Sequence, residues 1–137
     1  MAVQTFTPPV RFTPQVQPTT ATVTTMGNFT ITIGNKQVEL YDATVYAVRD
    51  GVANPVVGVW RMQCVTRISP ASSNGEMPTG AAGSTNPSYL SKMFSDATLN
   101  AAFVINASNQ LVIQVTGLTT TTIDWFATVD QTVWNST

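Results

Sequence analysis

Seven carboxylate side chains are the residues of this chain best able to carry acid–base chemistry, because the sequence has no histidine and one cysteine. Histidine is the commonest general base and metal ligand, so its absence removes most catalytic constellations. A glycoside hydrolase needs only two suitably separated carboxylates. The carboxylates are Glu39, Asp42, Asp50, Glu76, Asp96, Asp124 and Asp130. A small glycan hydrolase that uses Asp42, Asp50, Asp124 or Asp130 is therefore the enzyme hypothesis that remains.

The spacing of these carboxylates does not favour catalysis. Asp124 and Asp130 fall on one face of a predicted strand, where six residues span roughly 20 Å. Paired catalytic carboxylates lie about 5 to 10 Å apart. Glu39 and Asp42 fall on opposite faces of their strand. The sequence thus predicts a protein that is not an enzyme, with no catalytic residues and no cofactor.

The single cysteine, Cys64, lies inside an apolar run at residues 56–68. In such surroundings a buried structural thiol is the expected state, and it is less reactive than an exposed one. One cysteine and no histidine leave too few ligands for a zinc site. The sequence predicts no metal site.

Four aromatic residues could line a surface on which sugars stack, which is the binding-module alternative. Trp60 and Trp125 fall on predicted core faces, which favours packing. Trp134, near the end of the chain, is the freer residue and a candidate interface contact. The four are Trp60, Trp125, Phe126 and Trp134.

Charged residues make up 9% of the chain, against about 25% in a typical soluble domain. A free monomer usually keeps a mixed, charged surface and a net charge away from zero, whereas this chain has a net charge of -1. Its surface is therefore predicted to be covered by other subunits. The alternative is a soluble monomer whose polarity comes from Thr, Ser, Asn and Gln.

Composition also argues against several partners. The six basic residues are scattered singly, so no basic patch for a phosphate backbone is expected. No apolar run approaches the ~20 residues that cross a bilayer, and the N-terminus lacks the layout of a signal peptide. We expect no nucleic acid or membrane partner, and a protein made in the cytoplasm.

Residues 1–25 are predicted to form an extended arm. Pro8, Pro9, Pro14 and Pro18 exclude a helix. Spaced apolar residues fit a strand that docks on another subunit, and the alternative is a disordered tail. The apolar residues are Val3, Phe6, Val10, Phe12 and Val16, of which Phe6, Val10, Phe12 and Val16 are the predicted partner-binding residues.

Residues 26–137 are predicted to form one β-rich domain. Alternation at 29–33 and 38–40 around Gly34-Asn35 predicts a hairpin, and 44–49 and 56–68 are further strands. A long loop is expected at 69–87 and a short helix at 87–97. Three consecutive strands at 102–106, 110–116 and 122–134 predict an antiparallel meander. The fold class is all-β, an antiparallel sandwich or barrel-like domain with one short helix and the N-terminal arm.

The C-terminal third resembles small virion proteins of tailed bacteriophages. The matching elements are Val115-Thr116-Gly117, a Thr-rich link, and a strand of the form TIxWxAxV at 122–129. The resemblance implies a β-rich virion component, usually a homotrimer, and lends no catalytic residue. It leaves the location in the particle open.

Two virion roles follow from this resemblance. A compact domain with an arm and no internal repeat favours a capsid decoration, or cement, protein that bridges subunits of the major capsid protein or another virion protein through the arm. The alternative is a tail fibre, tail-tip or adaptor protein that contacts the host surface. In either case the expected location is the virion.

Overall fold

The computed structural model of the chain describes residues 5–19, 21–34, 37–49, 56–69, 72–77 and 88–135. Every regular element in these ranges is a β-strand, so the predicted all-β class is confirmed. No helix in the described ranges is long and apolar enough to cross a membrane. The strands are β1 (Thr5–Phe12), β2 (Gln15–Val16), β3 (Val23–Thr32), β4 (Gln37–Arg49), β5 (Val56–Ile68), β6 (Gly75–Glu76), β7 (Ser88–Phe94), β8 (Asn100–Ile105), β9 (Gln110–Thr116) and β10 (Asp124–Asn135).

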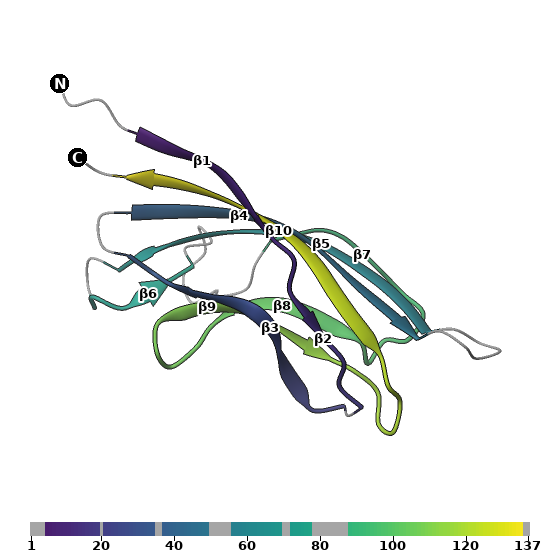
Figure 1. Cartoon of the computed structure of the whole chain (residues 1–137). Coiled ribbons are helices and arrows are strands. Elements are labelled where there is room, and N and C mark those ends of the chain that lie inside the picture. Colours follow the sequence, from purple (N-terminus) through teal and green to yellow (C-terminus); the bar gives the residue numbers. More distant parts are fainter. Residues whose placement is uncertain are drawn as a thin grey trace.

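The strands form one curled antiparallel sheet in the order β6-β5-β4-β10-β2-β3-β9-β8. β7 adds to β5 at one edge, and β1 adds to β10. Figure 1 shows that the curl produces two facing layers, with β4, β5, β7 and β10 in the larger layer and β3, β8 and β9 in the smaller layer. The result is a half-barrel whose inner surface is the core.

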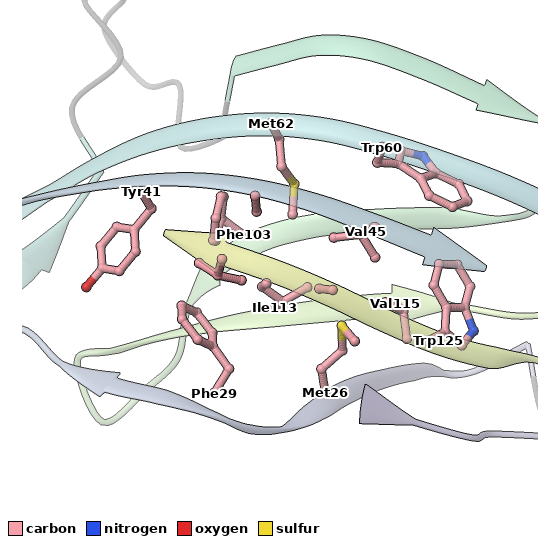
Figure 2. Packing of buried hydrophobic residues seen from close by; sticks show 14 of the residues in the cluster. Met26, Phe29, Tyr41, Val45, Trp60, Met62, Phe103, Ile113, Val115 and Trp125 are labelled. Carbon is pink, nitrogen blue, oxygen red and sulfur yellow. The ribbon is translucent and has the colours of Figure 1, made fainter. Parts of the chain in front are cut away.

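Alternation along the long strands makes one face of each layer apolar. In β4, buried residues alternate with more exposed ones from Glu39 to Ala47, the pattern of a half-buried strand. Trp60 and Trp125 meet between the layers with ring centroids 5.2 Å apart. Figure 2 shows Met62 and Tyr41 of the larger layer pointing into the core, where Phe29, Phe103 and Ile113 come from the smaller layer.

β2 joins the two layers at a close backbone approach. Gln15 pairs with Gly27 of β3, while Val16 pairs with Trp125 of β10. A Cβ atom at Gly27 would lie 3.1 Å from the Gln15 carbonyl oxygen, closer than ordinary contact. Glycine at this position therefore lets the sheet curl without displacing β2.

The N-terminal arm is not supported by the structure, which is a correction to the prediction from the prolines. Residues 5–12 form β1 and pair with residues 129–135 of the same chain's β10. The prolines are tolerated because β1 is an edge strand, and the register shifts between Thr7 and Val10, where Pro8 and Pro9 lie. The extended conformation was predicted correctly, but its partner is β10 of the same chain.

The short helix predicted at 87–97 is also wrong, since residues 88–94 form the edge strand β7. β7 pairs with residues 58–63 of β5 and contains a register shift. A short apolar run is compatible with the periodicity of a helix or of a strand. An isolated helix of this length is only marginally stable. Pairing with β5 satisfies the backbone groups on one edge of β7, which favours the strand over the helix.

Two predicted strand pairings are wrong although the strands exist. Residues 29–32 and 38–40 belong to β3 and β4, but β3 pairs with β9 and β2, and β4 pairs with β5 and β10. The β8–β9 hairpin is confirmed, whereas β10 lies in the other layer. Asn35, in the predicted turn, lies outside the described residues. Both connections cross between the layers.

The predicted loop at 69–87 contains a structured part. β6 pairs with the end of β5, Arg67 forms an ion pair with Glu76 at 2.6 Å, and Met77 is buried. Residues 70–71 and 78–87 of that loop lie outside the described residues. The part of the loop next to β5 is therefore a continuation of the sheet.

Candidate interaction surface

The outer face of the larger layer, opposite the core, carries a row of apolar side chains. The pairing registers place Met93 of β7 beside Val59 of β5, Val59 beside Tyr46 of β4, and Tyr46 beside Phe126 of β10. Met93 is 64% exposed and Phe126 is 41% exposed. We call these four residues, Met93, Val59, Tyr46 and Phe126, the outer apolar row.

The row is not part of the core. Its neighbours along each strand, such as Trp60 and Trp125, point inward and are already packed. Tyr46 and Phe126 stack at 4.9 Å with an interplanar angle of 16°. An antiparallel sheet with one solvated face is expected to be polar on that face. A contiguous apolar row there is a candidate contact surface.

The edge strand β7 exposes two further apolar side chains. Leu90 is 50% exposed and Phe94 is 45% exposed. The Phe94 ring lies parallel to Trp60 with centroids 6.2 Å apart, so it covers the edge of the core. Val57, in β5, adds a further exposed apolar side chain beside this edge. The apolar surface therefore extends from β10 to the sheet edge at β7.

A band of paired charges crosses the same outer face. Arg11 binds both carboxylate oxygens of Asp130, at 2.9 and 3.2 Å. Asp42 lies directly opposite Asp130 on β4 and contacts Arg61 at 3.9 Å. Hydrogen bonding from Arg11 lowers the pKa of Asp130 below its ordinary value. The four charges sum to zero, so the band carries no net charge.

Loss of the Arg11 side chain is expected to raise the pKa of Asp130. Arg11→Ala removes the hydrogen bonds and the positive charge, and leaves Asp42 as the nearest charge. A lowered carboxyl pKa stabilises the fold above the unfolded-state pKa, and this contribution is lost as pH falls through the lowered value. NMR titration of the Asp130 carboxyl carbon measures the shift. Arg61→Ala is the control, because Arg61 contacts Asp42; an unchanged Asp130 pKa in Arg11→Ala would contradict the assignment.

A groove of about 470 Å³ lies on the outer face where β2 meets β10. Gln15 lies opposite Phe126, and both line the groove. Gln17 donates a hydrogen bond from its amide to Oδ1 of Asp124. The lining set is Gln15, Val16, Gln17, Asp124, Trp125 and Phe126. The groove therefore combines two amides, one carboxylate and one exposed aromatic ring.

Comparisons with known proteins give one distant likeness. No protein-family model matches the chain, and no curated protein sequence matches it. The tailspike protein of Acinetobacter baumannii phage AM24 is similar with a TM-score of 0.49 and 10% sequence identity, over 93% of this chain and 26% of that chain. The chain thus spans about a quarter of the tailspike's length.

The predicted partner-binding residues lie in β1 and β2 and are not gathered on one surface. Val10 is 45% exposed. Phe12 packs edge-on against the core residue Phe29 at 5.5 Å, and Val16 also packs on the core. Phe6 pairs with Trp134 by register, but the side chain of Phe6 lies outside the described part. Their role in binding a partner stays a prediction.

Trp134, the candidate interface residue, lies on the outer face at the opposite end of β10 from the groove. Its register partners are Val38 of β4 and Phe6 of β1. Trp134 is partly buried. Its role as an interface contact stays a prediction.

The carboxylates considered for catalysis lie apart, with one exception. Asp124 lines the groove and Asp130 lies in the charge band, whereas Glu39 is buried and accepts a 2.5 Å hydrogen bond from Thr66. Asp42 faces Asp130, a juxtaposition that depends on the β4–β10 register and was missed. Asp50 lies outside the described residues. Among the described residues no cluster of three or more metal-ligating side chains occurs.

The aromatic and cysteine predictions are largely confirmed. Trp60 and Trp125 are buried in the core, as expected. Cys64 is buried, and loss of solvation raises the pKa of its thiol. Of the four aromatic residues considered for stacking on sugars, Phe126 is the one that is exposed and lines the groove.

Proposed function

We propose that this protein is a structural component of a virion, and specifically a capsid decoration protein that attaches to the shell through the outer apolar row. The observation that carries the proposal is the exposure of Met93 and Phe126 on a sheet whose inner face already holds a complete core. Fully burying one large apolar side chain contributes roughly 1.5–3 kcal/mol. A few such contacts provide stable attachment.

Two features of the sequence support the virion assignment. The chain has few charges, which suits a protein that spends its life covered by other subunits. Its C-terminal segment, now seen as β9, the link after it and β10, resembles segments of small phage virion proteins. A protein that binds only the assembled shell stabilises that shell by mass action. The partners are a major capsid protein or another virion protein, together with further copies of this chain as a homotrimer.

The decisive variant for this proposal is Met93→Glu. A carboxylate at this exposed position does not disturb the core, but it places a charge at the β7 end of the outer apolar row. Affinity for bare shells is expected to fall at least about tenfold, equivalent to ~1.4 kcal/mol. Co-sedimentation of the purified protein with shells that lack it measures this change.

Val23→Glu is the matched control. Val23 is 54% exposed and lies in β3 of the smaller layer, away from the outer apolar row. It should bind shells as the wild type does. Equal binding of Met93→Glu and the wild type would overturn attachment through the row. Light scattering of each variant gives the number of copies in solution, and copy number in purified particles separates a decoration protein from the alternative tail component.

A further inference from the structure

We infer that the groove between β2 and β10 is a binding site for a neutral, hydroxyl-rich ligand, a hexose or N-acetylhexosamine unit of a glycan. This site shares Phe126 with the protein contact proposed above and otherwise uses different residues. Its volume of about 470 Å³ falls in the ~300–1,000 Å³ range of small-molecule sites. The groove is open to solvent along the outer face, which suits one unit of a longer chain.

The aromatic wall of the groove is Phe126. Its ring is 41% exposed, and one ring face is covered by Tyr46 of β4. Phe126 also lines the groove toward β2, where Gln15 is its register partner. The C–H face of a sugar ring carries partial positive charge and packs against the negative face of an aromatic ring. The stack with Tyr46 holds Phe126 in place for that contact.

The polar wall supplies hydrogen bonds that match hydroxyl groups. Asp124 accepts one hydrogen bond from Gln17, which leaves further acceptor capacity on the carboxylate. The amide of Gln15 makes no hydrogen bond with the described residues, and it can donate and accept at once. A carboxylate beside two amides suits adjacent hydroxyls, each of which donates and accepts.

Charge narrows the ligand class. Among the described residues that line the groove, Asp124 is the one ionised side chain and none is basic. An acidic sugar or a phosphate would meet a like charge and no partner. A neutral saccharide meets no such repulsion. An organic amine could pair with Asp124, but a protonated amine offers no hydrogen-bond acceptor to the N–H groups of the glutamine amides.

The test is an NMR titration of the full chain with neutral oligosaccharides of glucose, galactose, mannose and N-acetylglucosamine. At least one is expected to shift the side-chain amide signals of Gln15 and Gln17. Asp124→Ala and Gln15→Ala should each weaken that binding at least about tenfold. Gln63→Ala is the matched control, because Gln63 is an exposed glutamine of β5 on the same face but outside the groove, and it should bind normally.

Three outcomes would overturn the inference. The first is the absence of any shift at the groove amides with every neutral sugar, and the second is unchanged binding by Asp124→Ala. The third is stronger binding of sialic acid or putrescine than of all neutral sugars. Phe126 belongs to both surfaces. The test variants therefore change residues that belong to only one of them: Met93 in the outer apolar row, and Gln15 and Asp124 in the groove. Met93→Glu should leave sugar binding intact, and the two proposals can therefore fail separately.

Discussion

A chain truncated to begin at Thr19 is expected to lose cooperative thermal unfolding. The truncation removes β1 and β2, which run along β10 from Asn135 to Trp125. Backbone hydrogen bonds also join Ala127 to Pro14 at 3.0 Å and Ile123 to Pro18 at 3.2 Å. Domains of this size are stable by only about 5–15 kcal/mol. Losing the two strands that cover one edge of β10 is expected to cost a large part of that free energy of unfolding.

Packing adds to the loss of backbone pairing in the truncated chain. Phe12 covers Phe29 in an edge-to-face contact, and Val16 packs on the same core. Phe12 is partly buried, so its loss costs less than the about 3–5 kcal/mol of a fully buried Phe side chain. The uncovered edge of β10 would also be open to pairing with other chains, so aggregation is expected. Circular dichroism during heating and light scattering measure both effects.

Val10→Ala is the matched control for the truncation. Val10 lies in β1 but is 45% exposed, and substitutions at such sites change stability by about 0.5 kcal/mol or less. It should unfold like the wild type. If the truncated chain unfolded cooperatively at the wild-type temperature, β1 and β2 would be dispensable for the fold, as a docking arm would be.

The location of β1 shows what the sequence could and could not predict. The prolines and the spaced apolar residues correctly indicated an extended segment. They carry no information on the partner strand, because β10 is more than a hundred residues away and pairing depends on tertiary register. Phe12 and Val16 were therefore predicted to bind another subunit, although both pack on the core of their own domain.

The same limit applies to the candidate surface. Alternation identified the inner faces of β9 and β10, and it placed Trp60 and Trp125 in the core. The outer apolar row lies across four strands, at one residue from each, so no local pattern contains it. One signal was present in the sequence. In a strand with one buried face, residues of the other face are usually polar, but Tyr46, Val59 and Phe126 occupy such positions and are apolar. Registers are needed to show that these positions meet.

The groove depends on a still longer separation in sequence. Gln15 and Gln17 lie in the predicted arm, while Asp124 and Phe126 lie in the last strand. Asp124 was considered only with Asp130 on its own strand, because spacing along a strand can be calculated from sequence. Its partner Gln17 is neither charged nor part of a motif. Only the pairing of β2 with β10 brings them together.

Phe29→Ala is expected to destabilise the protein by about 3–5 kcal/mol. Phe29 is 0% exposed and contacts three aromatic rings: Phe12 at 5.5 Å, Tyr41 at 6.0 Å and Phe103 at 6.3 Å. These neighbours come from three other strands in both layers, so they cannot all move to fill the space that the ring leaves. The free energy of unfolding is measured by urea denaturation.

Phe126→Ala provides the matched comparison, since the same atoms are removed from an exposed ring. Phe126 loses its stack with Tyr46 and little else from within the domain, so a cost of about 0.5–1.5 kcal/mol is expected. The two variants separate the roles of the two faces of the sheet. Phe29 is needed for the layers to hold together, whereas Phe126 is available to bind a ligand. Equal costs for both substitutions would mean that the outer face is as much a part of the fold as the inner one.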